Sequence, residues 1–307
     1  VGPAPTLPGI LGASAPKINN ADMKSYGWEM ELSWRDRIED FNYGVRFTLA
    51  DGQRKVLKYP NESGDIYSWY NNKLDGTIWG YTTVGIAQTQ EEMDAHLANN
   101  KPNWGSNWGA GDIMYADLNG DGEVTSGSKT LNDHGDLKII GNSYARYNFG
   151  FTVDGSWRGL DFSIFLQGTM KRDYWLDGPY FWGASGDEWQ SACFTEHLDY
   201  WTPEHTNAYY PKPYFGNIKK NQEVQSGYLQ NAAYLRVKNV QVGYTLPKSW
   251  TKKAAMESVR FYVSGDNLLT WTGISSIFDP ETLGGDWGPG KLYPLQRTLS
   301  VGVNVNF

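Results

Sequence analysis

Long stretches in which apolar and polar residues strictly alternate constrain the fold of this chain more than any other feature of its sequence. From Tyr26 to Arg35 the even positions are apolar, and the odd positions from Glu29 onward are polar. Successive side chains of a β-strand point to opposite faces, so a period of two indicates a strand with one apolar and one polar face. Similar segments lie at about 26–35, 41–49, 144–154, 160–167, 239–246, 259–263 and 295–307. We therefore predict an all-β protein with about seven strands.

Composition supports this prediction and excludes some classes of function. The chain has 307 residues with 35 Gly, 20 Tyr and 14 Trp, an abundance that is typical of β-rich proteins. Its formal charge of -7 argues against nucleic acid as a partner, because nucleic-acid binding needs clustered Lys and Arg. The single cysteine, Cys193, cannot form a disulfide within the chain, and its apolar and aromatic neighbours predict a buried side chain.

The lengths of the connections distinguish between the two architectures that alternate in this way, the β-sandwich and the β-barrel. The connections at 35–41 and 157–159 are short, 246–258 is moderate, and 49–144, 170–233 and 268–294 are long. In an up-and-down meander this order places every long connection at the same end of the sheet. Outer-membrane barrels have short periplasmic turns and long extracellular loops. We therefore predict antiparallel strands of a transmembrane β-barrel, with extracellular loops at about 50–143, 171–232 and 270–293.

The number of predicted strands indicates that they form part of a larger barrel. Backbone groups within a bilayer must all be paired, and bacterial barrels close with an even number of strands. About seven strands leave unpaired edges, and the chain ends on an alternating segment with an aromatic residue, Phe307. We therefore expect residues 1–307 to be the C-terminal part of a barrel in the cell outer membrane, in contact with its lipid.

An acidic segment in the first long loop has the pattern of a calcium-binding loop. Such a loop places oxygen ligands at alternate positions, with glycine at the sixth position for the sharp turn. The twelfth position, where a closing glutamate would stand, is Ser128, so either Asp133 or Asp136 could supply the last carboxylate. The alternative is a turn held by its own side chains without a metal. The other candidate ligands are Asp117, Asn119, Asp121 and Glu123.

The long loops are rich in tryptophan, whose indole faces can stack on the C–H faces of sugar rings. The alternative is that these rings form small cores that hold the long loops in shape. As a group they favour a carbohydrate pathway or an interface with a partner protein. The candidate substrate-binding residues are Trp104, Trp108, Trp175, Trp182 and Trp189.

Signals for an enzyme are weak. Asp187 and Glu188 are a pair of carboxylates beside Trp189, but adjacent loop positions rarely give the opposed geometry that glycoside hydrolysis needs. The 4 histidines show no metal-ligand spacing, and the sequence contains no nucleophile elbow or phosphate-binding loop. We therefore expect no enzymatic activity.

Four stretches, spread in order from residue 20 to the end of the chain, carry a set of motifs. They are residues 20–34, 111–141, 200–214, and 234–246 together with 259–307. Taken together, these stretches resemble the C-terminal region of SusC-like, TonB-dependent glycan transporters of Bacteroidetes. In the third stretch His205 stands where the family more commonly has asparagine. The resemblance implies a 22-stranded barrel with an N-terminal plug, a capping SusD-like lipoprotein and energy supplied through TonB. It also favours Asp136 as the closing calcium ligand, while the plug and the TonB-contacting segment are absent from these residues.

Other functions remain compatible with the same residues. One is a soluble carbohydrate-binding β-sandwich that depends on calcium and aromatic side chains, and another is a glycoside hydrolase. Members of the same transporter family import different glycans, and some import peptides, so a peptide substrate is a further alternative.

Overall fold

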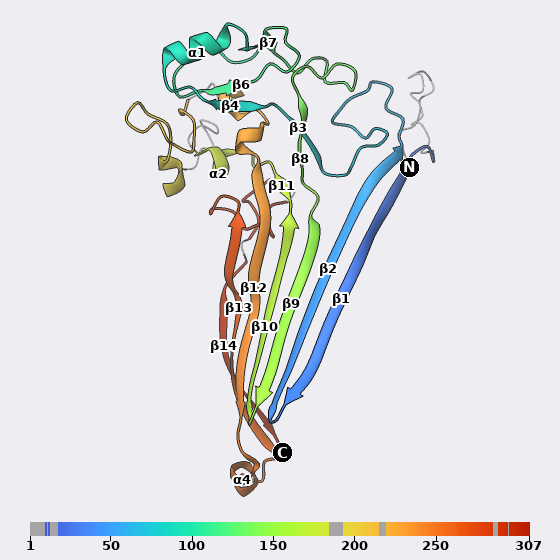
Figure 1. Ribbon diagram of the computed structural model, residues 1–307, viewed down its shortest axis with the longest axis vertical. Coiled ribbons are helices and arrows are strands. Elements are labelled where there is room, and N and C mark those ends of the chain that lie inside the picture. Colours follow the sequence, from blue (N-terminus) through green and yellow to red (C-terminus); the bar gives the residue numbers. More distant parts are fainter. Residues whose placement is uncertain are drawn as a thin grey trace.

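Seven long antiparallel strands form one open, curved sheet in the computed structural model (Figure 1). The structure describes residues 10, 12, 18–183, 193–214, 219–284, 288–293 and 295–307. The strand order is β1-β2-β9-β10-β12-β13-β14, so each long strand pairs with the long strands that precede and follow it in the sequence. The long strands are β1 (Asp22–Ile38), β2 (Phe41–Lys58), β9 (Arg146–Trp157), β10 (Leu160–Lys171), β12 (Gln230–Thr245), β13 (Ser258–Gly273) and β14 (Thr298–Asn306).

The predicted strands are therefore confirmed, but several run further than their alternating segments. β2 continues to Lys58, β12 begins at Gln230 and β13 ends at Gly273, so each enters a segment that was expected to be loop. Pairing in a sheet uses backbone groups and does not need an apolar side chain at every second position. The alternating segment therefore marks only the part of each strand that has one apolar and one polar face, and these strands extend beyond that segment.

The register of the sheet keeps polar residues beside polar residues across all seven strands. Directly opposed residues share a face, because their side chains project to the same side of the sheet. One such row consists of Arg35, Gly44, Asp154, Ser163, Gln241, Ser264 and Ser300. The neighbouring row, on the opposite face, consists of Trp34, Val45, Val153, Ile164, Val240, Gly265 and Leu299.

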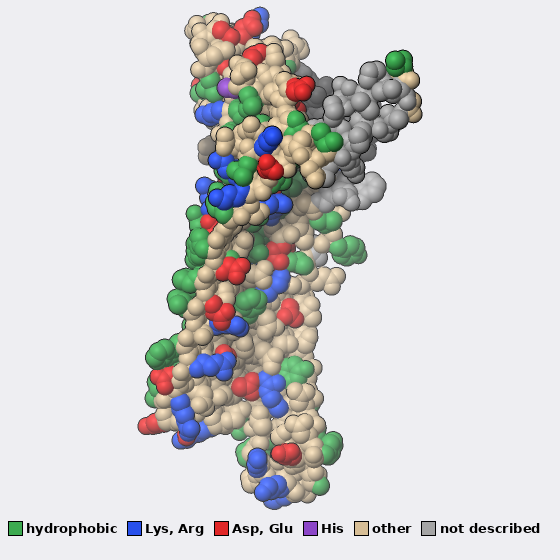
Figure 2. All heavy atoms as spheres, turned by 90° about the vertical axis from the view of Figure 1, so that its right-hand side faces the viewer, with side chains coloured by type: hydrophobic (Ala, Val, Ile, Leu, Met, Phe, Trp, Pro, Cys, Tyr) green, Lys and Arg blue, Asp and Glu red, His purple; other side chains and the backbone are tan. Residues whose placement is uncertain are grey.

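The apolar face of this sheet is exposed. Trp34, Leu299 and Val301 expose 63%, 75% and 83% of their surface, which is far more than side chains in a protein interior. A soluble β-sandwich would cover this face with a second sheet at about 10 Å. The long strands instead form a single sheet, so the sandwich alternative is wrong. Figure 2 shows hydrophobic side chains along the left edge of the strand region, with acidic and basic side chains beside them.

The polar face carries ion pairs that link different strands. Arg46 Nε lies 2.8 Å from Glu31 Oε1, which joins β2 to β1. Arg35 Nη2 lies 3.4 Å from Asp154 Oδ1 and reaches it across Gly44 on the strand between them. A Cβ atom at Gly44 would lie 2.9 Å from that carboxylate oxygen, so the absence of a side chain there allows the approach.

All three long loops lie at one end of the sheet, and the short turns lie at the other (Figure 1). The loop end contains the short strands β3 (Thr77–Gly80), β4 (Thr83–Ile86), β5 (Lys101–Pro102), β6 (Ile113–Tyr115), β7 (Glu123–Val124), β8 (Lys138–Asn142) and β11 (Asp173–Tyr174). It also contains the helical segments α1 (Gln90–Leu97), α2 (Pro179–Trp182), η3 (Thr195–Leu198), α3 (Lys219–Gln222) and η4 (Ser226–Tyr228). Among the described residues, the helical segments at the turn end are α4 (Lys248–Thr251) and η5 (Lys252–Ala254).

Two further observations concern single elements. Within the described part of the chain, no helix is both long and apolar enough to cross a bilayer. The prediction that Cys193 is buried is wrong, because its side chain is exposed. Cys193 precedes η3, and the ring of the next residue, Phe194, stacks on Tyr180 while the thiol is exposed, so neighbouring composition did not decide its burial.

Candidate functional site

The three long loops share one hydrophobic core, and this core gives the loop end a defined shape. It combines residues from all three loops, for example Tyr115 from the first, Phe181 from the second and Phe278 from the third. Such side chains stabilise the loops by about 25 cal/mol for each Å² of apolar surface removed from water. The fully or nearly buried members are Ile66, Tyr81, Ile113, Tyr115, Val124, Leu137, Leu176, Phe181, Trp182, Tyr210, Tyr228, Ala232, Ile274, Phe278 and Leu283.

A buried ion pair ties the first loop to the second. Lys220 Nζ lies 2.6 Å from Asp112 Oδ2, and both side chains are fully buried. The same ammonium donates a hydrogen bond to the carbonyl of Asn107 at 2.6 Å. Asp112 also accepts hydrogen bonds from the backbone N–H of Gly109 at 2.7 Å and from Asn221 Nδ2 at 3.0 Å. Each charge therefore has the partners that a buried ion pair needs.

Of the candidate tryptophans, Trp182 is part of this core, and Trp175, Trp104 and Trp108 pack against it. Trp182 is only 5% exposed, and its ring centroid lies 5.1 Å from Phe181, 4.9 Å from Tyr228 and 6.0 Å from Trp175. Trp175 packs against the same buried cluster. In the chain as described, these two rings hold the second loop in shape. Trp189 lies outside the described residues, as do Asp187 and Glu188.

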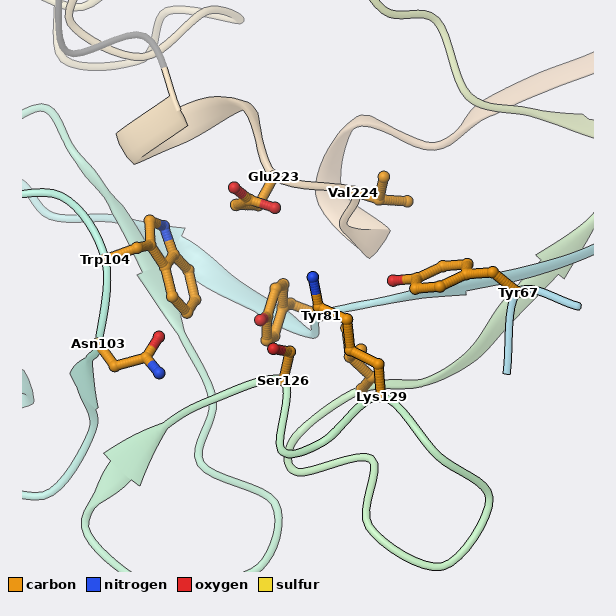
Figure 3. Close-up of a pocket in the computed structure, with 9 residues that line it drawn as sticks. Tyr67, Tyr81, Asn103, Trp104, Ser126, Lys129, Glu223 and Val224 are labelled. Carbon is orange, nitrogen blue, oxygen red and sulfur yellow. The ribbon is translucent and has the colours of Figure 1, made fainter. Parts of the chain in front are cut away.

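Trp104 and Trp108 belong to an aromatic group in the first loop. Both rings pack edge-on against Tyr115, with centroid distances of 5.2 Å and 6.1 Å. Trp104 also lies 4.7 Å from Tyr81, and Lys220 Nζ lies 5.2 Å from the ring of Trp108. Trp104 differs from the other described candidates because it also lines the cavity drawn in Figure 3.

This cavity has a volume of about 190 Å³, which is far more than a single water molecule needs. Figure 3 shows Lys129 and Glu223 pointing into it from opposite sides, with Tyr67 beside them and Trp104 at its edge. Burial, followed by the negative charge of Glu223, raises the pKa of Tyr67 above its usual 10.0, so its hydroxyl stays protonated at neutral pH. The lining residues are Tyr67, Tyr81, Asn103, Trp104, Ser126, Lys129, Leu137, Glu223 and Val224.

The predicted calcium loop is built from consecutive turns in which each side chain holds the following backbone. Asp117 accepts hydrogen bonds from the N–H groups of Asn119, Gly120 and Gly122 at 3.1, 2.7 and 2.8 Å. Asp121 Oδ1 accepts one from the N–H of Glu123 at 2.8 Å. Gly120 and Gly122 have φ values of 82° and 90°, which glycine adopts without strain.

Asp136 and Asp133 have different roles in this loop. Asp136 is fully buried, and its two oxygens accept hydrogen bonds from the N–H groups of Leu118 at 2.6 Å and Thr125 at 2.7 Å. Asp133 instead closes its own turn with Ser128. The described residues contain no group of three or more His, Cys, Asp or Glu side chains arranged to hold a metal ion. These oxygens are of the type that calcium prefers, and calcium binding stays a prediction.

Sequence reasoning missed the residues that join the loops. Lys220 lies outside the four stretches on which the resemblance rests, and Asp112 was not recognised as its partner. Lys129 and Glu223 come together only because loops distant in the sequence meet at the cavity. Lysine and glutamate are common in loops, so no local pattern marks them. Only the tertiary fold identifies them.

Comparison with known proteins supports the resemblance inferred from the sequence. No protein-family model matches the chain. It is 26% identical over 98% of its length to TonB-dependent receptor P3 of Formosa agariphila, and 22% identical over 94% to TonB-dependent receptor SusC of Bacteroides thetaiotaomicron. The chain spans 30% and 27% of the lengths of these two relatives. Both are named as receptors, and neither name is that of an enzyme.

A solved structure gives the same fold. The structure of the RagAB peptide transporter matches with a TM-score of 0.70 and 20% identity, covering 98% of this chain and 31% of that one. The chain therefore has the fold of a section of that transporter. More specifically, its predicted resemblance to SusC-like TonB-dependent outer-membrane receptors is confirmed.

Proposed function

We propose that this chain is part of an outer-membrane, TonB-dependent importer of oligosaccharides that works with a SusD-like surface lipoprotein. In this proposal the exposed apolar face contacts outer-membrane lipid and the polar face lines the interior of a 22-stranded barrel. The long loops lie outside the cell, where they meet the substrate and the lipoprotein. The plug and the TonB contact belong to other parts of the complete protein.

The observation that carries the proposal is the separation of polar and apolar rows over seven consecutive strands. A barrel needs one face for lipid and one for a polar interior, and both rows are continuous from β1 to β14. The loop end adds the aromatic edge of Trp104 and the polar groups around the cavity, which suit a sugar ring and its hydroxyls. The confirmed resemblance to TonB-dependent receptors supports the energy source.

Uptake of labelled oligosaccharides by cells that carry the complete protein tests this function. We expect uptake in wild-type cells and none in cells without TonB. Trp104→Ala should lower uptake roughly threefold to tenfold, which corresponds to the loss of about 0.5–1.5 kcal/mol of aromatic contact. Trp250→Ala is the matched control, because Trp250 is 64% exposed on α4 at the opposite end of the sheet. Uptake that does not depend on TonB would refute the proposed function. Equal uptake by the Trp104 and Trp250 variants would refute the role of Trp104.

Peptide import is the second candidate, and one feature of the cavity favours it. Lys129 and Glu223 place opposite charges on one small cavity, as the two ends of a short peptide would require. The related RagAB structure is that of a peptide transporter. Competition separates the two functions: unlabelled peptides should not reduce oligosaccharide uptake if the glycan proposal is right.

We further propose that calcium orders the loop at residues 117–136. Asp117, Asn119, Asp121 and Glu123 would bind the ion, and Asp136 would close the site, with Asp121 and Glu123 turning toward Asp117. Titration calorimetry of the complete protein with Ca²⁺ should show a binding isotherm that Asp121→Ala abolishes. Identical isotherms for the wild type and the variant would exclude the site.

A further inference from the structure

Two lysines oppose each other on the apolar side of the sheet, at its loop end. Lys24 on β1 pairs directly with Lys55 on β2, and the pair two residues further along is Tyr26 with Gln53. Because side chains alternate, these pairs share the face that carries Trp28. Lys24 Nζ lies 5.6 Å from the ring of Tyr26, so its stem follows this face. Figure 2 shows Lys and Arg side chains gathered where the strands meet the loops.

The position of the two lysines relative to the apolar band identifies their surroundings. Trp34 follows Tyr26 by eight steps along the strand, which is about 27 Å in length and about 21 Å of height at a tilt of 40°. The exposed side chains between them include Trp28, Met30 and Leu32, so this stretch corresponds to a membrane-spanning apolar band with aromatic ends. Lys24 and Lys55 lie one step beyond this band, at the level of lipid headgroups.

The described residues place no ion-pair partner beside the two lysines. Arg54, the neighbouring cation on β2, forms an ion pair with Asp75. Within the described part of the chain, no carboxylate forms an ion pair with Lys24 or Lys55, although Asp22 and Lys58 oppose each other nearby. Like charges directly opposite on adjacent strands destabilise the pairing. Such a pair is favourable when an anion lies between the two ammonium groups.

We propose that Lys24 and Lys55 bind the phosphate of a phosphorylated glycolipid in the outer leaflet of the membrane. The inference rests on the proposed outer-membrane location, which places the long-loop end at the outer leaflet, where such glycolipids are found. The two ammonium groups supply the charge, and the exposed aromatic face of Tyr26 and Trp28 supplies a surface for the sugar ring and acyl chains. A single phosphate between the strands also removes the repulsion of the lysine pair.

Native mass spectrometry of the complete protein, extracted from outer membranes in mild detergent, tests this site. The wild type should retain phosphorylated glycolipid. The variant that combines Lys24→Gln with Lys55→Gln should retain at least roughly tenfold less of it, because each lysine adds to the attraction between the protein and an anionic lipid. Lys252→Gln combined with Lys253→Gln is the matched control, since these lysines are exposed on η5 at the opposite end. The control should retain as much lipid as the wild type.

Thermal stability supplies an independent readout. Adding the phosphorylated glycolipid to delipidated protein should raise the melting temperature of the wild type and of the control, but not that of the Lys24/Lys55 variant. Equal lipid retention by the variant, or equal stabilisation of the wild type by the dephosphorylated glycolipid, would overturn the proposal. If instead the proposed outer-membrane location is wrong, the wild-type protein itself will be missing from the outer-membrane fraction, and this result is distinguishable from loss of lipid binding alone.

Discussion

At the scale of single residues, glycines and buried charges decide which strands and loops are held together. Gly243 lies on the strand between Arg260 and Asp161, and a Cβ atom there would collide with the guanidinium. The arginine therefore reaches across the glycine and binds the carboxylate through two nitrogens, at 2.5 and 2.9 Å. Gly44 has the same role between its neighbouring strands. On the polar face, small residues thus determine which charges can meet.

The buried pair of Lys220 and Asp112 gives a prediction at this scale. Lys220→Met should destabilise the loop end by about 3–5 kcal/mol, because it leaves the carboxylate of Asp112 buried without its counter-charge. Hydrogen exchange of residues 105–115 and 219–225 in the complete protein measures the loss. Adding Asp112→Asn to Lys220→Met should restore much of the protection. If the double variant exchanges as fast as the single one, the loss comes from packing and not from charge.

At the scale of elements, the sequence predicts the sheet well and the loops poorly. Alternation depends only on which face each side chain occupies, so segments such as 26–35 and 160–167 identify their strands, and connection lengths place the long loops at one end. The extra length of β2 could not be read, because Gly52, Gln53 and Arg54 carry no alternating pattern. The loop core depends on contacts between distant segments. Tryptophans such as Trp182 therefore resembled binding residues while forming the core.

The loop at residues 117–136 should lose order in acid. The N–H groups of Gly122 and Gly120 lower the pKa of Asp117 below its usual 3.8, and the hydroxyl of Ser128 does the same for Asp133. A carboxylate whose pKa is lowered by folding stabilises the folded loop above the unfolded value, and this contribution disappears as the pH falls through the folded pKa. Hydrogen exchange of this loop, corrected for intrinsic rates, should therefore accelerate only below about pH 4.

Asp117→Asn provides the control for this pH dependence. The asparagine side chain keeps an acceptor oxygen but cannot titrate, so exchange in the loop should change less between pH 5 and pH 3 than in the wild type. The long strands serve as the internal reference, and their exchange should not accelerate over this range. An unchanged acid response in the variant would show that another group controls the loop.

At the scale of the whole molecule, the two faces of the sheet require different solvents. Val263 projects to the apolar face and exposes 56% of its surface, while Ser264, the next residue, lies in the polar row that crosses all seven strands. In the proposed outer-membrane barrel, the same substitution at these adjacent positions would therefore place a charge in lipid or in water. This contrast depends on the membrane and is absent for a protein dissolved in water.

The matched pair gives the prediction for the whole molecule. Val263→Arg should destabilise the complete protein in lipid vesicles by about 2–4 kcal/mol if the position lies near the bilayer centre, and by less toward the interface. Ser264→Arg should have a much smaller effect, because its charge faces the polar interior. Chemical unfolding in vesicles, followed by tryptophan fluorescence, measures both. Equal effects at the two positions would contradict contact of the apolar face with lipid.

The shared core of the three loops has a consequence for how such proteins diverge. Tyr115, Phe181 and Phe278 come from different loops and fill the same interior, so exchanging one loop for a relative's would leave gaps and unmatched shapes in the other two. We therefore expect recombination to preserve stability best when it transfers these loops as a set. New specificity in this lineage should arise either by joint replacement of the set or by single changes at its surface.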